Sequence, residues 1–448
     1  MRIAVIGGVA AGTSAAAKAR RTDKDAEIVI FEKGTDISYG GCGLPYYISD
    51  VIKEREDLIA FTAEEFEEKY GVEVKIKHEV TDIDAEAKKL TYKNLENGEE
   101  SSYQFDKLVI ATGATPIKPP FEGVDLDNVF TLRNVNNGDA IKEAVHSEEV
   151  KDAVIIGAGL IGLEMAESFS EAGLNVKVIE LMPQVLPPFS EEMAGLVEKE
   201  LKANGVEVIL DDGVDHFKGA GKLQSVVTQS GREFKADIAL LSIGVKANTE
   251  LAEKAGIEIG ETGAIQVNKK METNLEDIYA AGDCAESVNI LTGKPAWVPL
   301  GSTANKMGRV AGENAAGGSY EHNGIIKTGI NKLFNLAAAR TGLSEEEASD
   351  NGFDVFSTKI KAHNHAGYYP GAEAIHLKGV FAKEDGRLLG AEVVGGEGSD
   401  KRIDVLVTAV QGTMTASDLF QLDLAYAPPY SGAKDAVAIL GMVAEKKV

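Results

Sequence analysis

The chain carries the same pattern of strand, glycine turn and helix twice, and this repeat restricts the fold more than any other feature. The first copy reads RIAVIGGVAAG at Arg2–Gly12, the second reads AVIIGAGLIG at Ala153–Gly162, and Gly7 and Gly157 are 150 residues apart. In both copies an apolar strand passes through glycines into a helix, which is how a βαβ unit begins. The spacing is that of a domain rather than of a short repeat. We therefore expect two α/β domains built on parallel sheets.

Each copy continues to a second strand that ends in an acid. These strands are Ile28–Glu32 and Val176–Glu180, and their acids follow the last turn glycine by 20 and 18 residues. A glycine turn brings a pyrophosphate against N–H groups at the helix N-terminus, and the acid accepts hydrogen bonds from a ribose. Val9 replaces the middle glycine of the first copy, whereas the second copy is complete. Two dinucleotide sites in one chain suggest one dinucleotide that stays bound and one that exchanges.

Composition and charge exclude several classes of protein. The chain has 448 residues, two Cys and a formal net charge of −25. At roughly 150 residues per domain, this length suggests about three domains. A nucleic-acid binder needs a basic surface, and no apolar run approaches the roughly 20 residues of a membrane helix, so we expect neither partner. Met1 leads straight into an apolar strand without a signal-peptide pattern, so a cytoplasmic protein is expected.

Two further strands end in small residues. They read LVIATG at Leu108–Gly113 and IYAAGD at Ile278–Asp283. Together with the two βαβ units, they resemble the pyridine nucleotide-disulfide oxidoreductase family along the whole chain. The resemblance implies an α/β protein with FAD in the first of two Rossmann-like domains and NAD(P)H in the second. It also implies an α+β dimerisation domain at the C-terminus.

The same resemblance implies that the NAD(P)H domain is inserted into the FAD domain. We expect residues 1–115 and 247–325 to form the FAD-binding domain and residues 116–246 to form the NAD(P)H-binding domain. Residues 326–448 are expected to form the dimerisation domain. In that region the sequence changes to short strands and turns, followed by an amphipathic helix around Ile403–Thr413.

The family's cofactor contacts map onto this sequence residue by residue. The resemblance implies that Asp283 binds the ribityl chain of FAD. The full set implied for FAD is Gly7, Gly8, Ala10, Ala11, Gly12, Glu32, Lys33, Val80, Ala111, Thr112, Gly113, Gly282, Asp283, Pro299, Leu300 and Ala304. The set implied for NAD is Gly157, Gly159, Leu160, Ile161, Gly162, Glu180 and Gly244. No metal site is expected, because His363 and His365 have no carboxylate or Cys at ligand spacing.

Cys42 is the candidate redox thiol. It lies in the run SYGGCGLPYY at 38–47, where Pro45 suits the first turn of a helix. A thiol near a helix N-terminus is stabilised as the nucleophilic thiolate. The second cysteine, Cys284, follows a strand end and is expected to pack in the core. A lone redox cysteine needs a partner that is not a protein thiol: a small thiol in a mixed disulfide, a sulfane sulfur, or oxygen as sulfenic acid.

Three groups in the resembled family use a single cysteine. They are coenzyme A-disulfide reductases, NADH-dependent persulfide or polysulfide reductases, and NADH oxidases and peroxidases. The run CGLPYY is similar to the first two groups, whereas the oxidases and peroxidases carry a His in the first glycine turn, where this chain has Ala10 and Ala11. We therefore expect an enzyme that reduces a small-molecule disulfide, persulfide or polysulfide. The alternatives are an NADH oxidase that forms water or hydrogen peroxide and, from another class, a flavoprotein that passes electrons to a protein redox partner.

Two C-terminal segments, GYYPG at 367–371 and AYAPPYS at 425–431, are similar to the signature of coenzyme A-disulfide reductases. The likeness implies a homodimer in which Tyr368 and Tyr426 reach the partner's thiol, where a phenol can donate a proton to a leaving thiolate. The alternative is aromatic packing at a dimer interface. The substrate contacts implied by the same likeness are Ser14, Lys18, Arg21, Ser38, Asn305, Arg309 and Lys434.

Charge indicates which nucleotides the chain selects. Glu180 can bind the 2′-OH of the NAD ribose and would repel a 2′-phosphate, so NADH is favoured over NADPH. Coenzyme A, a candidate ligand, is strongly anionic and needs local cations on this acidic chain. Lys18 and Arg21 are three residues apart and share one helix face. The alternative is an ordinary solvated helix end. Gly41 stands where the family often has Asn, which removes one polar contact to that ligand.

Overall fold

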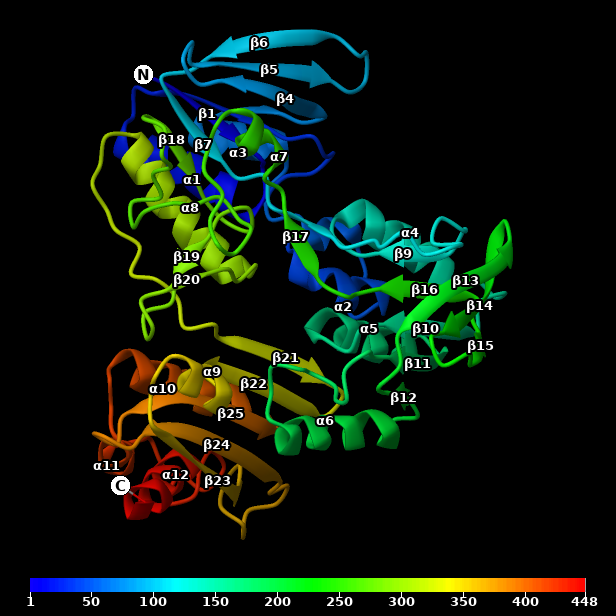
Figure 1. Ribbon diagram of the computed structural model, residues 1–448, viewed down its shortest axis with the longest axis vertical. Helices are drawn as coiled ribbons and strands as arrows, with labels where there is room; N and C mark the ends of the chain where they lie inside the picture. Colours follow the sequence, from blue (N-terminus) through cyan, green and yellow to red (C-terminus); the bar gives the residue numbers. More distant parts are fainter. Residues whose placement is uncertain (448) are drawn as a thin grey trace. The chain divides into compact units, whose positions relative to one another are not determined.

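Figure 1 shows the helices and strands of the computed structural model, which describes residues 1–447. The chain divides into two compact units. The first unit is formed by Met1–Ile117, Leu132–Lys142 and Val245–Ile325, and the second by Lys118–Thr131, Glu143–Gly244 and the chain from Ile326 onward. Each unit contains one of the two glycine turns. Within residues 1–447 no helix has both the length and the apolar character needed to cross a membrane.

A five-stranded parallel sheet lies at the centre of the first unit. Its strand order is β18 (Ile278–Ala280), β7 (Lys107–Ile110), β1 (Arg2–Ile6), β2 (Glu27–Phe31) and β3 (Glu73–Lys75). The central strands are continuous apolar runs, as expected for strands covered on both faces. Their side chains form the main core of this unit together with those of two helices, α1 (Ala10–Thr22) and α8 (Gly301–Ala315).

The helices α1 and α8 pack closely because small residues face each other. A Cβ added at Gly308 would lie 2.2 Å from the carbonyl oxygen of Ala11, and one at Gly312 would lie 2.0 Å from that of Ala15. Only glycine fits at such a close backbone approach. As a result, the predicted substrate residues on α1 and α8 lie on neighbouring helices.

Smaller elements complete the first unit. The helices are α2 (Leu44–Ile48), α3 (Ala63–Tyr70) and α7 (Glu250–Lys254), with the 3-10 helices η1 (Gly41–Gly43) and η2 (Arg55–Leu58). An antiparallel sheet is formed by β4 (His78–Asp84), β5 (Lys89–Asn94) and β6 (Glu100–Gln104). Two further pairs of strands are β8 (Ala114–Pro116) with β17 (Val245–Ala247), and β19 (Ser287–Val288) with β20 (Pro295–Ala296). The helix α4 (Val135–Val145) begins in this unit and ends in the second.

The second unit repeats the parallel arrangement. Its first sheet has the order β12 (Glu207–Ile209), β11 (Asn175–Ile179), β10 (Asp152–Ile156), β16 (Ile238–Leu241) and β9 (Val129–Thr131). Its other elements are the helices α5 (Leu160–Glu171) and α6 (Glu191–Ala203) and the antiparallel strands β13 (Val214–Ala220), β14 (Lys222–Thr228) and β15 (Glu233–Lys235).

The C-terminal part of the second unit is an α+β module with an antiparallel sheet. The strand order is β21 (Gly329–Leu333), β22 (Leu336–Gly342), β25 (Leu388–Gly395), β24 (Ala374–Ala382) and β23 (Val355–His363). The helices of the module are α9 (Glu345–Asp350), α10 (Ser399–Gln411), α11 (Ala416–Gln421), α12 (Ala436–Ala444) and the 3-10 helix η3 (Glu445–Lys447). Two parallel sheets followed by this module confirm the predicted fold class.

Candidate active site

The glycine turn of the first unit is shaped to hold a pyrophosphate. Gly7 has a φ of +102°, and a Cβ there would lie 2.2 Å from the carbonyl oxygen of Ala111. A Cβ at Gly12 would lie 1.8 Å from the carbonyl oxygen of Gly7. Val9 is tolerated as the N-cap of α1 because its φ is −102°, so the middle position of the motif needs no glycine. The glycines therefore allow a tight turn directly before the first N–H groups of α1, and such N–H groups suit a phosphate.

The residues predicted to bind FAD gather mostly at one edge of this sheet, because parallel strands present their carboxyl ends on the same side. The N–H of Gly8 donates to Oε2 of Glu32 at 2.7 Å, and a Cβ on Gly282 would lie 2.7 Å from that of Ala11. At the strand ends and in the first turn of α1 lie Gly7, Gly8, Ala10, Ala11, Gly12, Glu32, Lys33, Ala111, Thr112, Gly113, Gly282 and Asp283. Val80 lies on β4, and Pro299, Leu300 and Ala304 lie at or just before the start of α8.

The second glycine turn has the same geometry. Gly157 has a φ of +100°, and a Cβ at Gly162 would lie 2.0 Å from the carbonyl oxygen of Gly157. Glu180 follows β11 as Glu32 follows β2, and both acids use their two oxygens alike. Glu180 accepts the N–H groups of Ala158 at 2.6 Å and Met182 at 2.9 Å. The predicted NAD set lies at the carboxyl ends of β10, β11 and β16 and at the start of α5: Gly157, Gly159, Leu160, Ile161, Gly162, Glu180 and Gly244.

Cys42 lies in η1, directly before α2, and its side chain is exposed. Pro45 occupies the first turn of α2, as the sequence predicts. The segment that leads to Cys42 is attached to the glycine turn, because the N–H of Ser38 donates to the carbonyl oxygen of Gly8 at 2.9 Å. The thiol is thus held on the same unit as the predicted FAD residues. Cys284 is fully buried and donates to the carbonyl oxygen of Ala281 at 3.4 Å, which agrees with a packing role.

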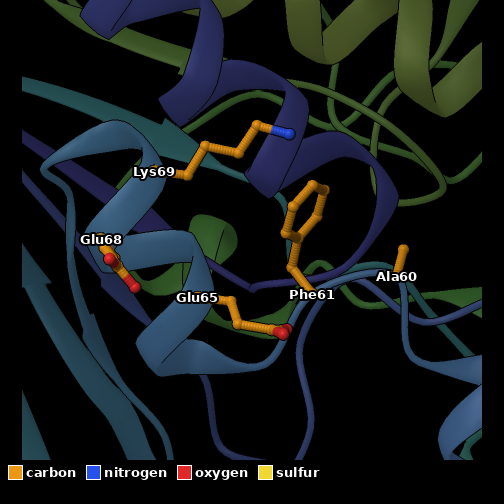
Figure 2. A pocket seen from close by; sticks show the side chains of 5 residues that line it. All are labelled: Ala60, Phe61, Glu65, Glu68 and Lys69. Carbon is orange, nitrogen blue, oxygen red and sulfur yellow. The ribbon is translucent and has the colours of Figure 1, made fainter.

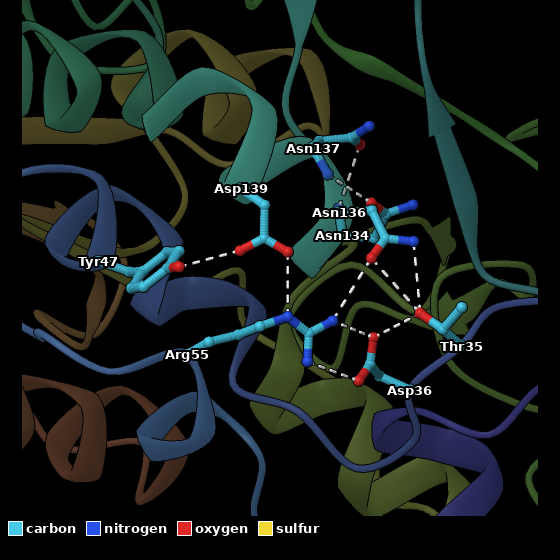
Figure 3. Close-up of polar contacts among 8 residues, drawn as sticks. All are labelled: Thr35, Asp36, Tyr47, Arg55, Asn134, Asn136, Asn137 and Asp139. Carbon is cyan, nitrogen blue, oxygen red and sulfur yellow. Dashed lines mark hydrogen bonds and ion pairs between the residues drawn. The ribbon is translucent and has the colours of Figure 1, made fainter. Parts of the chain in front are cut away.

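A polar network connects the residues on both sides of Cys42 (Figure 3). The guanidinium of Arg55 donates to both oxygens of Asp36, at 3.0 and 2.7 Å, and through Nε to Asp139 on α4 at 3.0 Å. The hydroxyl of Tyr47, on α2, donates to the other oxygen of Asp139 at 2.9 Å. Asp36 precedes Cys42 by six residues and Tyr47 follows it by five, so Arg55 and Asp139 brace the thiol segment at both ends.

The network also shifts the pKa of Asp36 and that of Tyr47. Burial raises the pKa of Asp36, but the hydrogen bonds from Arg55 and Thr35 outweigh it and leave the pKa below its usual value. Burial, together with Asp139, raises the pKa of Tyr47 to about 12, so its hydroxyl stays protonated and continues to donate. Sequence reasoning missed this network, because Arg55 lies in an ordinary charged run and its partner Asp139 is 84 residues away.

The predicted coenzyme A contacts on α1 and α8 come together only in part. Ser14 donates to Oδ1 of Asn305 at 2.5 Å, and Arg309 is exposed on the same helix as Asn305. Lys18, however, forms an ion pair with Glu313 at 3.0 Å, so part of its charge is already compensated. Ser38 lies in the segment before Cys42, and Lys434 is exposed in the second unit, just before α12.

A surface pocket lies at α3, and Figure 2 shows its lining of Ala60, Phe61, Glu65, Glu68 and Lys69. The ammonium of Lys69 lies 4.3 Å from the centre of the Phe61 ring. Two carboxylates against one lysine give this pocket a net negative lining that opposes phosphate groups.

The two predicted tyrosines meet at the surface of the C-terminal module. Their hydroxyl oxygens are 3.2 Å apart, and the residues are 76% (Tyr368) and 51% (Tyr426) exposed. The hydrogen bond to Tyr426 raises the pKa of Tyr368, so that phenol remains a proton donor at neutral pH. Two segments far apart in the sequence therefore present a pair of adjacent phenols to solvent.

A buried arginine holds the two tyrosine segments in place. Arg402, on α10, is 1% exposed and donates to the carbonyl oxygen of Asn364 and to Asp435, both at 2.7 Å. Asn364 precedes Tyr368 by four residues, and Asp435 follows Tyr426 by nine. Burial raises the pKa of Asp435, but hydrogen bonds and the charge of Arg402 outweigh it and lower the pKa overall. This pair was also missed from the sequence.

Comparison with known proteins agrees with this geometry. The family model described as pyridine nucleotide-disulphide oxidoreductase matches residues 1–308, and the model of its dimerisation domain matches residues 331–437. The chain belongs to this family. The resemblance drawn from the sequence motifs is therefore confirmed, and with it the FAD and NAD(P)H cofactors that the family uses. The glycine turns of both units fit these two dinucleotides.

Two relatives and one solved structure illustrate what the chain is similar to. An NAD(P)H sulfur oxidoreductase (CoA-dependent) of Pyrococcus furiosus is 41% identical, over 99% of this chain and 98% of the relative. An NADH oxidase of Methanocaldococcus jannaschii is 36% identical, over 100% of this chain and 99% of the relative. The solved structure of an NAD-dependent persulfide reductase from A. fulgidus has a TM-score of 0.97 at 43% identity and covers 100% of this chain and 83% of that one.

Proposed function

We propose that this family member is a homodimeric, FAD-dependent NADH oxidoreductase that reduces sulfur in a small-molecule disulfide, persulfide or polysulfide. The observation that carries the proposal is Cys42, an exposed thiol at the start of a helix and attached to the FAD-binding turn. Relatives that act on sulfur, one of them coenzyme A-dependent, support it. We place the reaction in the cytoplasm, because an exposed thiol that must stay reduced persists there.

The proposed reaction begins with the Cys42 thiolate. It attacks one sulfur of coenzyme A disulfide, forms a mixed disulfide and releases coenzyme A thiolate. Two electrons that originate from NADH then cleave the mixed disulfide, which regenerates the Cys42 thiolate and releases the second coenzyme A thiolate. With a persulfide, Cys42 takes the outer sulfur and releases the thiolate, and the same two electrons release HS⁻. Bound FAD supplies the relay of the two electrons from nicotinamide to sulfur.

Tyr368 and Tyr426 are the proposed proton donors. Each leaving thiolate needs a proton, and a phenol at hydrogen-bonding distance can donate one. The tyrosines belong to the part of the chain that matches the family's dimerisation domain. We propose that they act on Cys42 of the partner subunit, so that each active site is shared between two chains.

The proposed site selects NADH through Glu180. Its carboxylate accepts two backbone N–H groups, which fix its position at the end of β11. A fixed negative charge repels the 2′-phosphate of NADPH. The anionic coenzyme A is proposed to bind Lys18, Arg21, Asn305 and Arg309 on α1 and α8, with Ser14, Ser38 and Lys434 as further contacts.

Replacing Cys42→Ser tests the proposal. We expect anaerobic NADH oxidation with coenzyme A disulfide, coenzyme A persulfide or polysulfide to fall by about a hundredfold or more, because the serine hydroxyl is a poor nucleophile. The FAD content should stay unchanged, since the glycine turn is intact. The matched control is Cys284→Ala, which should retain activity. Full activity in Cys42→Ser would refute the mechanism.

The second candidate function is an NADH oxidase, which the Methanocaldococcus jannaschii relative favours. Ala10 and Ala11, in the first turn of α1, provide no acid for reduced oxygen, which speaks against it. Oxygen consumed per NADH distinguishes the two activities. An oxygen-dependent rate above the rate with every sulfur acceptor would make this second candidate the correct one.

A further inference from the structure

Four charged residues form a continuous row across four strands of the C-terminal sheet. In the strand register, Lys359 on β23 pairs with Lys378 on β24, Lys378 pairs with Glu392 on β25, and Glu392 pairs with Arg340 on β22. Directly paired residues of antiparallel strands lie on the same face of the sheet. Lys378 and Glu392 are 9% and 8% exposed, so the middle of the row is buried.

Every member of the row contacts one short segment, Pro188–Glu192, at the start of α6. Glu392 accepts the N–H of Ser190 at 2.8 Å and its hydroxyl at 2.5 Å. Arg340 donates to the carbonyl oxygen of Pro188 at 2.6 Å. Both lysines pair with Glu192, Lys359 at 2.8 Å and Lys378 at 3.4 Å.

The same segment leads directly from the proposed NADH contact. The chain from Glu180 to Ser190 crosses the surface between β11 and α6 with Leu181 and Met182 exposed and Leu186 buried. It is attached in its second half by the N–H of Leu186, which donates to the carbonyl oxygen of Ala158 in the glycine turn at 2.9 Å. At its far end the segment is attached to the row of charges, through the contacts of Pro188 and Ser190 with Arg340 and Glu392. The segment is therefore clamped between the nucleotide turn and the C-terminal sheet.

We propose that this charged row positions the segment that follows Glu180, and that Glu392 thereby sets the affinity for NADH. The inference rests on the proposed function, because it takes the second glycine turn as the NADH site. Glu392 is the central member: its buried carboxylate accepts two hydrogen bonds from Ser190 and is paired in register with a cation on each side. Removing it leaves the start of α6 without its buried acceptor, so the adenosine side of the NADH site loses its fixed geometry.

The test compares Glu392→Ala with Glu392→Gln in the FAD-loaded enzyme. Glu392→Ala should raise the KM for NADH, and the Kd for NAD⁺ measured by calorimetry, by about tenfold, the loss expected for hydrogen bonds to a charged group. The kcat should stay within about twofold, because the residue does not touch the sulfur chemistry. Glu392→Gln keeps an acceptor for the Ser190 N–H and should restore most of the affinity. The control is Lys361→Ala, an exposed residue on β23 two positions beyond Lys359.

A Kd for NAD⁺ unchanged in Glu392→Ala would overturn the inference, as would a kcat that falls as much as the KM rises. Should Glu392→Ala fail to fold, Ser190→Ala removes the hydroxyl donor from the same contact. This variant too should raise the KM for NADH while kcat stays nearly unchanged. Glu180→Ala separates this inference from the proposed function. If Glu180→Ala leaves NADH and NAD⁺ binding unchanged, the NADH assignment itself fails, whereas an effect of Glu180→Ala without one of Glu392→Ala refutes only the charged row.

Discussion

Arg402 and Asp435 form a buried ion pair on which the position of both tyrosine segments depends. Their side chains are 1% and 5% exposed, and Nη2 of Arg402 lies 2.7 Å from Oδ2 of Asp435. Ser431 also donates to this oxygen, at 2.7 Å. A buried charge that loses its partner is far more costly than an exposed one, so the pair makes the geometry of the phenols dependent on a single guanidinium.

Replacing Arg402→Met should lower the free energy of unfolding by about 3–5 kcal/mol, because the carboxylate of Asp435 would remain buried without a counter-charge. Urea unfolding measures this change. The control is Lys383→Met, which breaks an exposed ion pair with Asp354 in the same module and should cost about 1 kcal/mol or less. Equal losses in the two variants would contradict the role given to burial.

At the scale of residues, the sequence predicted those side chains whose role depends on local spacing. The turn glycines, Glu180 and Cys42 are of this kind, because strand, turn and helix follow one another within a few residues. The partners of Lys18 and Arg55 could not be predicted. Glu313 and Asp139 come from distant helices, and no periodicity in the sequence gives the register in which those helices pack. The roles of the predicted site residues remain predictions.

At the scale of elements, α5 carries an acid whose ionisation is coupled to folding. Burial, with a smaller effect from Glu167, raises the pKa of Glu164 to about 7. Glu167 itself is paired with Lys332 and accepts the N–H of Phe334 at 2.8 Å. The folded protein therefore binds a proton at Glu164 more tightly than the unfolded chain does. The stabilisation is fully present below about pH 4.5, the ordinary value for Glu, and is lost as pH rises through about 7.

Glu164→Gln should therefore change stability only at higher pH. The amide carries no charge, so the variant avoids the cost of ionising a buried acid and should be more stable than the native chain at pH 8, by at most about 3 kcal/mol. At pH 4 the two proteins should be alike. Thermal unfolding across this range measures the difference. If the difference in stability between Glu164→Gln and the native chain were the same from pH 4 to pH 8, Glu164 would not titrate as described.

The boundaries of elements were predictable where apolar periodicity defines them. The expected amphipathic helix around Ile403–Thr413 exists, but α10 begins at Ser399 and ends at Gln411. Its first turn is polar, so the apolar pattern starts only at Ile403, and its N-cap is Gly398 at a φ of +82°. The helix start is set by a glycine conformation and by the buried Arg402, neither of which periodicity reveals.

At the scale of the whole molecule, the net charge of −25 argues against a nucleic-acid partner but does not identify any other. An anionic substrate requires only local cations, and the candidates lie on α1 and α8 of the first unit and at Lys434 in the second. The sequence predicted the two parallel sheets because each of them carries its own strand, glycine turn and helix. The C-terminal dimerisation domain has no glycine turn of this kind, and the sharing of active sites between two chains stays a proposal.

Mixed dimers test whether the active sites are shared. Cys42→Ser supplies intact tyrosines, and a Tyr368→Phe, Tyr426→Phe double variant supplies an intact thiol; each homodimer should be nearly inactive. If the tyrosines act on the partner's thiol, each heterodimer contains one complete site. Random exchange of equal amounts should then restore roughly a quarter of native activity, since half of the dimers carry one of two sites. If each thiol uses the tyrosines of its own chain, no heterodimer has a complete site and the mixture stays inactive, which would disprove the shared site.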